Sequence, residues 1–566
     1  MVIARREEEG WRTNKGDEDE DEDDDDEHAP EDNPPPMNLH PFAREALAQI
    51  PKILTLQDRN AHSPTYGCFD RNFWHYKIID FPAGMAAEFV WPLALAYALP
   101  GEGNPYHQQP AIWEWVAAGI HYAARSAHPD GSCDDYFPFE KAAGAAAFSL
   151  LAALESYTLL GFDDAGMREF FQKRASWLAD HHESGRLTNH QALIVLCLER
   201  AGRLLKTTEW DGLKRQRMGR VLEWQNSEGW LQEYEGADPG YHTLTVGLLA
   251  QIYELTPSPE LKTALEKAIR FAAHFVHPDG SFGGEYTSRN TYNFFPHGFE
   301  IAGRWMPEAL EINQRFLAGL ERGLGACYAD DHIIGHHTWS YLLAHQYFVA
   351  ERPPIAPRPT GRMYLRNAGI VIDRRDGAEL YLALNKGGVF KFFRGDKLVC
   401  SDTQISVRAE ERGRAKTAVA HLVGKYDIDF SQDHITVQGQ LGWAKGKGMT
   451  TVNLVILRIL MFTIGRFNPD LVRRLLQKLL ITGKKPAPFD FRRNFKWVDG
   501  KLQIEDELRA PDWSKVEAVG IGGSQTSIYV VMSRTYQHGQ LQPWLDLTPR
   551  ARALKPGEPL RLSREF

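Results

Sequence analysis

The stretch HPDGSFGGEYTSRNTYNFFPHGFEIAG, residues 277–303, opens with five residues, HPDGS, that also occur at 128–132. This repetition indicates that one structural unit recurs along the chain. Polar loops, each with a glycine, separate Ala- and Leu-rich segments between residues 40 and 350. The glycines are Gly84, Gly131, Gly185, Gly229, Gly280 and Gly335, at intervals of 47, 54, 44, 51 and 55 residues. This spacing fits one helical hairpin per unit.

Such a hairpin is too small to bury its own apolar face, so neighbouring hairpins must pack against one another. Six hairpins that close on themselves form an α/α toroid, with all the glycine loops facing one cavity. An open arc of hairpins is the alternative. The segment KAAGAAAFSLLAALESYTLLG (141–161) carries apolar residues at helical spacing. We predict a multidomain α and β protein whose residues 37–357 form an α/α toroid.

The composition changes after residues 357–360. Short alternating apolar runs separated by Gly and Asp turns follow, as in MYLRNAGIVIDRRDGAELYLALNKGG (363–388). This pattern predicts an antiparallel β-sandwich for residues 358–566, with a helical insertion near 453–485. Within the insertion, NPDLVRRLLQKLLITGKK (468–485) either packs over the sheet or makes a peripheral contact with a membrane surface.

Composition restricts the remaining possibilities. Residues 1–36 carry 16 acidic and 4 basic residues, so we expect a disordered acidic tail. The chain's net charge of −9 minus the tail's −12 leaves +3 for the rest, a weak match to a polyanion and no sign of nucleic-acid binding. The five cysteines form no C-x-x-C pair. No signal peptide and no membrane-spanning stretch is visible, so a cytoplasmic location is the default expectation.

Two loops carry residues suited to acid–base chemistry. Asn189 and His190 begin an apolar segment, where a helix N-terminus would favour an anion. The alternative is that Asn189 serves only as an N-cap. Tyr241 follows the sequence DPG, with Tyr234 seven residues before it. A tyrosine near cations can carry a proton, and simple packing is the alternative.

The loop of residues 277–303 and its counterpart after residue 128 supply further polar groups. Arginine is suited to bidentate contacts with a carboxylate. Glu140 and Glu300, each just inside the following helix, would lie on matching walls of the cavity or would form salt bridges with Lys141 or Arg289. The candidates for substrate binding in these two loops are Tyr136, Glu140, Arg289, Asn290, Tyr292, His297 and Glu300. Tyr234, Lys391 and Arg394 are the candidates for substrate binding outside them.

Three motifs in this order, NHQ (189–191), EYEGADPGYHTLT (233–245) and SRNTYNFFPHGFE (288–300), resemble the heparinase II/III-like polysaccharide lyases. The resemblance covers the chain from about residue 40 to 566 and is weak in the β-rich part. It implies cleavage of a uronic-acid glycan by β-elimination. By this resemblance Asn189 and His190 neutralise the carboxylate, and Tyr241, or less well Tyr234, moves the proton. Preplaced donors stabilise the developing charge, a role that suits Arg289 and His297.

The chain departs from the family pattern in its β-rich part. Many family members have a catalytic histidine early in this region, but the comparable segment FKFFRGDKL (390–398) offers Lys391 and Arg394 instead. Either Tyr241 acts as both base and acid, or this branch has lost or altered the activity. A structural zinc or calcium ion is conceivable, but His421, Asp427 and His434 match no recognisable site, so we predict no cofactor.

The leading hypothesis is therefore a polysaccharide lyase acting on an acidic polysaccharide or oligosaccharide. A glycoside hydrolase on the same scaffold is one alternative, because Glu140 and Glu300, or Asp238 and Glu300, could flank a glycosidic bond. A non-catalytic glycan-binding protein or a uronate epimerase in exopolysaccharide assembly is the other.

Overall fold

The structure is a computed structural model of the chain. It describes residues 39–181, 185–233, 236–328, 331–431, 433–444, 450–469, 471–472, 485–526 and 535–566. The predicted acidic tail, Tyr234 and most of the segment 468–485 lie outside the described residues.

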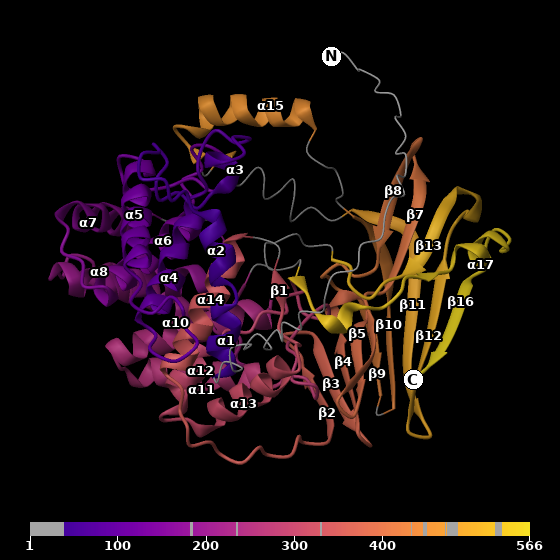
Figure 1. The fold of residues 1–566 in the computed structure, drawn as a ribbon. Coiled ribbons are helices and arrows are strands. Elements are labelled where there is room, and N and C mark those ends of the chain that lie inside the picture. Colours follow the sequence, from indigo (N-terminus) through magenta and orange to yellow (C-terminus); the bar gives the residue numbers. More distant parts are fainter. Residues whose placement is uncertain are drawn as a thin grey trace, which may run out of the picture. The chain divides into compact units, whose positions relative to one another are not determined.

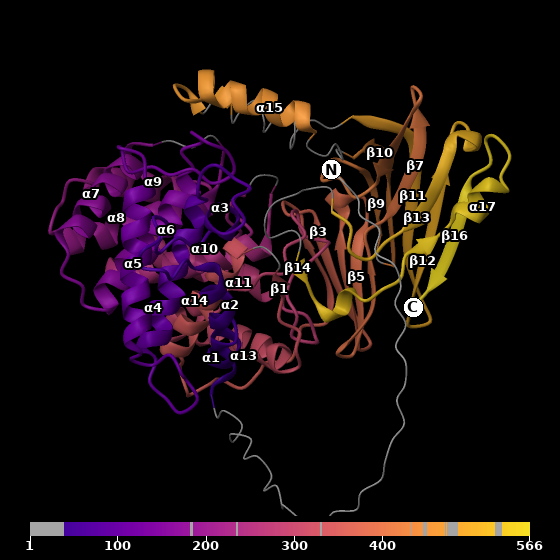
Figure 2. The same ribbon diagram turned by 45° about the horizontal axis from the view of Figure 1, so that its top comes forward.

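Helices of the N-terminal half gather on one side of the molecule, beside the sheets (Figures 1 and 2). Their contacts close a double ring. The inner helices are α4 (Val90–Ala98), α6 (Ala143–Leu159), α8 (Thr188–Leu205), α10 (Pro239–Leu255), α12 (His297–Gly303) and α14 (Asp331–Gln346). Each packs against the next, and α14 packs against α4, which closes the ring. The α/α toroid is therefore confirmed, and the open arc is wrong.

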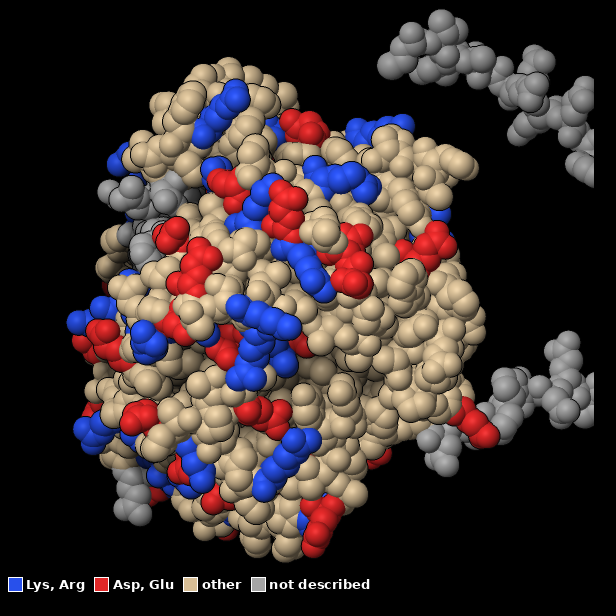
Figure 3. All heavy atoms as spheres, turned by 90° about the vertical axis from the view of Figure 1, so that its left-hand side faces the viewer, with Lys and Arg blue, Asp and Glu red and all other residues tan. Residues whose placement is uncertain are grey.

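An outer layer of helices returns the chain between the inner ones. Its members are α1 (Pro41–Leu47), α5 (Pro110–Ser126), α7 (Ala165–Asp180), α9 (Asp211–Glu223), α11 (Pro259–Ala273) and α13 (Pro307–Glu321). The short helices α2 (Ile50–Leu56), α3 (Arg71–Trp74) and η1 (Gly84–Phe89) complete this half. Basic and acidic side chains are interspersed on the face shown in Figure 3, so this face carries no field of one sign.

Sequence explains which helices lie inside. Helix α6 is apolar on every side and buries 14 of its residues, as a helix packed on both faces must. Helix α11 buries only one stripe, including Leu261, Leu265 and Ala268, and leaves its charged side to water.

The two HPDGS segments build the same turn. His128 N–H donates to Ser132 O at 2.9 Å, and His277 N–H donates to Ser281 O at 2.8 Å. Gly280 has φ +83°, and a Cβ there would lie 2.6 Å from the carbonyl oxygen of Arg315, so glycine is required. Gly335 differs from the expectation: it lies within α14 and not in a loop, because the helix begins at residue 331.

The C-terminal half contains two stacked antiparallel sheets, which confirms the β-sandwich. The first contains β2 (Gly361–Leu365), β3 (Ile370–Arg375), β4 (Ala378–Ala383), β5 (Val389–Arg394) and β6 (Lys397–Asp402) in chain order. The second has the order β15 (Leu545–Asp546), β13 (Val516–Ile521), β7 (Ile405–Glu411), β8 (Arg414–Val419), β10 (His434–Trp443), β11 (Pro486–Val498), β12 (Lys501–Arg509) and β16 (Leu560–Glu565), with β9 (Asp427–Phe430) beside β10.

The first sheet lies between the helices and the second sheet, and side-chain alternation along β5 shows this. Phe390 and Phe392 pack into the core between the two sheets. Val389 and Phe393 pack into the core shared with the helices. Lys391 has the same parity as these two residues and therefore points toward the helical half.

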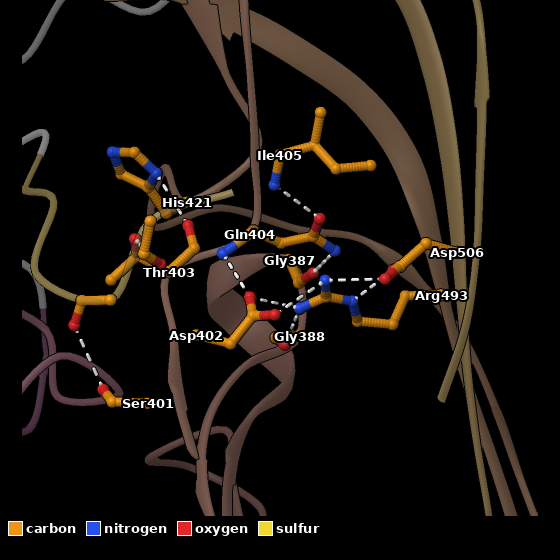
Figure 4. A network of polar contacts seen from close by, with 12 residues as sticks. Gly387, Gly388, Ser401, Asp402, Thr403, Gln404, Ile405, His421, Arg493 and Asp506 are labelled. Carbon is orange, nitrogen blue, oxygen red and sulfur yellow. Dashed lines mark hydrogen bonds and ion pairs between the residues drawn. The ribbon is translucent and has the colours of Figure 1, made fainter. Parts of the chain in front are cut away.

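A buried ion-pair network lies within the sandwich (Figure 4). Arg493 on β11 contacts Asp402 at 2.8 Å and Asp506 at 2.5 Å, and all three side chains are nearly inaccessible. Arg564 on β16 adds a second cation 2.7 Å from Asp402. Although burial alone would lower the pKa of Arg493, the two carboxylates raise it. The network joins β6, β11, β12 and β16.

Candidate active site

The N-terminal ends of the inner helices meet at one rim of the toroid, because each outer helix brings the chain back to the same side. Polar contacts among the loops and first turns at this rim, and between them and the second turn of α14, show the arrangement. The pairs are Gly84 N–H to Asp134 O (2.7 Å), Thr188 N–H to Gln232 O (3.2 Å), Arg289 N–H to Asp238 Oδ2 (3.1 Å), Asn293 to His337 (3.2 Å) and His336 to Glu88 (2.5 Å).

The central group of this rim is the buried carboxyl of Glu233. The side-chain amide of Asn189 donates to its Oε2 at 2.9 Å, and the backbone N–H of Asn189 donates to Oε1 at 3.2 Å. The guanidinium of Arg289 lies 3.3 Å from the same Oε2. Burial raises the pKa of Glu233, and the charge of Arg289 acts in the opposite direction.

Tyr241 lies beside this group. It stands in the first turn of α10, and the guanidinium carbon of Arg289 is 4.8 Å from its ring centre. Asp238 fixes both residues, since its carboxylate accepts the backbone N–H of Tyr241 at 3.0 Å and that of Arg289 at 3.1 Å. Asp238 also accepts a hydrogen bond from Thr291. The side chain of Tyr241 is half-buried, so it retains access to solvent.

His190 follows Asn189 in the first turn of α8, which begins at Thr188, so Asn189 is the second helical residue and not the N-cap. A Cβ added at Gly144 of α6 would lie 2.9 Å from Cε1 of His190. The histidine ring thus lies directly over α6, and glycine at this point makes room for it. His190 is half-buried, in contrast to Asn189.

Histidines of α14 complete the rim, and the sequence analysis did not select them. His336 stacks on Phe148 with ring centres 4.1 Å apart and pairs with Glu88. His337 contacts Asn293, and burial, followed by the charge of His336, holds its pKa well below the usual value. In the sequence, the signal for these two histidines is the pair HH in IIGHHTWSY (333–341). The signal for Glu233 is its position beside Tyr234.

The first sheet contributes two buried lysines to the segment before α12. Lys391 lies 3.2 Å from Oε2 of Glu285 and 4.5 Å from the ring centre of Tyr292. The hydroxyl of Tyr292 donates to Glu285 as well. Lys386 donates to the carbonyl oxygens of Glu285 and Thr287 at 2.8 and 2.7 Å.

Asn290 is held in the same way. Its Oδ1 accepts a hydrogen bond from Lys386, and its amide donates to the carbonyl oxygen of Gln525 at 2.7 Å. The residue has φ +57°, a conformation that asparagine tolerates better than most residues. The loop that carries Arg289 is therefore braced by the β-sandwich.

Other predicted residues lie away from Tyr241. His297 is buried within α12, bonds Ser340 at 2.8 Å and has its pKa lowered by burial to about 3. Glu300 accepts from Asn313 and Arg352, each at 2.8 Å. Arg394 donates to the carbonyl oxygen of Phe566 at 2.9 Å. These partners tie each group into the scaffold.

The loop before α6 is also largely self-contained. The carboxylate of Glu140 accepts the backbone N–H of Tyr136 at 2.7 Å, while the ring of Tyr136 is 61% exposed. Lys141 pairs with Asp130, not with Glu140. The ring of Tyr136 is therefore exposed to solvent, whereas Glu140 shapes the loop.

The described residues contain no group of three or more His, Cys, Asp or Glu side chains arranged to hold a metal ion. A cavity of about 140 Å³ lies between α5 and the η1 loop, lined by Phe69, Tyr122 and Cys133 among others, and is not lined by Asn189 or Tyr241. No helix in the described part of the chain is both long and apolar enough to cross a bilayer.

No protein-family model and no curated protein matches this sequence. Among solved structures, the chain is similar to a mutant of chondroitin AC lyase from Streptomyces coelicolor A3, at 11% identity and a TM-score of 0.47, over 85% of this chain and 67% of that one. It is similar to heparinase III at 11% identity and a TM-score of 0.46, over 77% and 63%. A glycoside hydrolase matches at 9% and 0.35, over 84% and 87%. The chain spans about two thirds of the length of the two lyases.

Proposed function

We propose that this protein cleaves a uronic-acid polysaccharide by β-elimination. The observation that carries the proposal is the group formed by Asn189, Tyr241 and Arg289 around the buried carboxyl of Glu233. An amide, a phenol and a guanidinium at one place supply the three functions that this elimination needs: neutralisation of a carboxylate, movement of a proton and stabilisation of developing negative charge.

The substrate carboxylate would bind at the start of α8. Asn189 and His190 stand in its first turn, where the helix dipole favours an anion. Neutralisation there makes the C5 proton of the uronate easier to remove. Because one amide hydrogen of Asn189 is held by Glu233, the orientation of its side chain is set before substrate arrives.

Tyr241 would move the proton. As a phenolate it takes the proton from C5, the C4–O4 bond breaks as the C4–C5 double bond forms, and the phenol then returns the same proton to O4. The cation of Arg289, held over the ring, attracts the phenolate in the resting state. One residue acting on one face in this way needs no histidine from the β-sandwich, and Lys391 is already paired with Glu285.

Glu233 determines the electrostatic balance of the site. A carboxylate here would repel the substrate carboxylate, but the adjacent cation of Arg289 offsets that repulsion. Glu233 would thus orient Asn189 and Arg289 while its own charge is balanced by the guanidinium. The hydrolase alternative receives less support, because Glu300 and Asp238 are both buried and occupied by structural hydrogen bonds.

Products of the reaction test the proposal. The protein is incubated with heparan sulfate, hyaluronan, alginate and bacterial glucuronan in water enriched in heavy oxygen, and the fragments are analysed by mass spectrometry. Elimination predicts fragments without solvent oxygen, each new non-reducing end lacking the elements of water. A saturated new non-reducing end, with solvent oxygen at C1 of the new reducing end, would establish hydrolysis instead. Uncut polymer that exchanges its C5 hydrogen in deuterated water would establish an epimerase.

A further inference from the structure

An exposed apolar helix projects from the second sheet. Helix α15 (Thr451–Leu460) continues into a π-helical turn, η3 (Met461–Gly465), and none of the described residues of α15 is buried. Large apolar side chains remain accessible along both elements and just beyond. They are Val452 (67%), Leu454 (43%), Val455 (51%), Ile456 (57%), Ile459 (59%), Phe462 (52%), Ile464 (49%) and Phe467 (86%), here called the apolar ridge.

Arg458 of α15 and Phe462 of η3 contact the toroid. Arg458 pairs with Asp80 at 3.0 Å and lies 5.4 Å from the ring centre of Phe81. Phe462 meets Phe139 edge-on, with ring centres 5.3 Å apart. Figures 1 and 2 both show α15 beside α3, above the helical half. These contacts fix the position of the ridge but leave its apolar side chains accessible.

A neighbouring loop extends the apolar surface. Tyr76 and Ile78, which follow α3 and precede Asp80, are 54% and 72% exposed. The top of the face in Figure 3, at the height where α15 lies in Figure 1, shows few charged side chains. Contiguous apolar surface of this kind is uncommon on proteins that remain monomeric in water, so the ridge indicates a binding surface.

The charge near the apolar ridge indicates which partner the ridge binds. The described residues of 451–472 carry two charged side chains, Arg458 and Arg466, and both are basic. In the sequence, residues 451–485 contain seven Lys or Arg residues and one acidic residue, a net charge of +6. Among the described residues, Lys77, Arg466 and Lys485 are exposed. A second copy of the chain would bring an equal positive charge against the first. An anionic lipid surface complements the charge and accepts the apolar side chains, as it does for amphipathic interfacial helices.

We propose that the apolar ridge binds the surface of a membrane that contains anionic lipids. The ten residues of α15 are about 15 Å long, too short to cross a hydrocarbon core of about 30 Å, so the helix would lie in the interface. Phe139 belongs to the loop before α6, so binding would place this part of the toroid rim near the bilayer. This proposal does not depend on the reaction that the protein catalyses.

Vesicle sedimentation of the full chain tests this proposal. Wild type is compared with the double variant Ile456→Glu/Ile459→Glu and with Leu541→Glu, a control at a residue that is 73% exposed outside the ridge. Vesicles are made either from phosphatidylcholine alone or from an equimolar mixture with phosphatidylglycerol. We expect wild type and the control to bind the anionic vesicles at least about tenfold more tightly than the neutral ones, and the double variant to lose at least about tenfold in binding.

Sedimentation equilibrium without lipid tests the alternative partner of the ridge, a second copy of the chain. A wild-type dimer that Ile456→Glu/Ile459→Glu converts to a monomer, together with an absence of vesicle binding, would assign the ridge to a second copy and overturn the proposal. Equal vesicle binding by wild type and the double variant would also overturn it. Thermal unfolding of the variants verifies that each is folded, which is expected because the substituted side chains are exposed.

Discussion

The guanidinium carbon of Arg289 lies 4.8 Å from the ring centre of Tyr241, and the carboxylate of Asp238 accepts a backbone N–H from each residue. One buried carboxylate thus fixes the backbone of a tyrosine in the first turn of α10 and of an arginine in a loop 48 residues later in the sequence. The relationship is useful for proton transfer, because a cation held at this distance stabilises the phenolate form by direct attraction.

Tyr241→Phe tests the proton carrier. Because the substitution removes only the hydroxyl, we expect substrate affinity to change little and turnover to fall by at least about 100-fold. Tyr253→Phe is the matched control: this tyrosine lies near the other end of α10 and packs against Trp305. Steady-state kinetics on the best polymer measures both variants. Equal turnover of Tyr241→Phe and the control would remove Tyr241 from the mechanism.

Arg289→Ala tests the buried pair. The change leaves the carboxyl of Glu233 without its cation, so we expect the free energy of unfolding to fall by about 3–5 kcal/mol. Glu233→Gln in the same chain should restore part of that loss, since a neutral amide tolerates burial better. Chemical denaturation of the two single variants and the double variant gives the coupling energy. Additive effects of the two substitutions would contradict a direct interaction.

Stability should decrease in mild acid. Burial lowers the pKa of His242 to about 4 and the pKa values of His297 and His421 to about 3, from an ordinary value of 6.5. Below pH 6.5 the unfolded chain therefore binds more protons at these residues than the folded chain does, and stability falls as the pH decreases through this window.

The expected slope is about 1.4 kcal/mol per pH unit for each of these histidines between pH 6.5 and the folded-state pKa. Melting temperatures measured from pH 7 downward give the slope for wild type. His297→Gln should reduce it, whereas His62→Gln, at an exposed histidine, should not. A slope that His297→Gln leaves unchanged would exclude this residue as a source of the acid sensitivity.

Arg493→Ala should strongly destabilise the β-sandwich. The substitution leaves Asp402 and Asp506 buried with only Arg564 beside them, and loss of one partner from a buried pair costs about 3–5 kcal/mol. Arg509→Ala removes an exposed surface pair with Glu507 and should cost no more than about 1 kcal/mol. Similar denaturation midpoints for the two variants would show that the network of Figure 4 contributes little.

Much of the fold follows from local patterns. The glycine spacing predicts the repeat. Four of the six glycines, Gly131, Gly185, Gly229 and Gly280, lie in turns with a positive φ, whereas Gly84 lies in η1 and Gly335 within α14. Closure of the ring depends instead on packing between α4 and α14, two helices that are far apart in the sequence. Alternation in the strands predicts the sandwich, but not that the first sheet would have a helical core on its other face.

Local sequence patterns also predict part of the candidate site. Asn189 and Tyr241 occupy first turns of inner helices, which bring them to one rim. The role of Glu233 as the common partner of Asn189 and Arg289 depends on contacts between loops, which no short motif encodes. His297 also begins a helix, yet its side chain contacts Ser340 in the core. The long segment that precedes α12 makes the contacts at the rim instead.

Ultraviolet absorbance of the unsaturated uronate tests the central claim most directly. The purified protein is mixed with heparan sulfate, hyaluronan, alginate and bacterial glucuronan, with Tyr241→Phe measured in parallel. Elimination at the site formed by Asn189, Tyr241 and Arg289 predicts that absorbance rises on at least one polymer with wild type and that the variant loses the rise. No rise with wild type on any of these polymers, or an equal rise with the variant, would contradict the account.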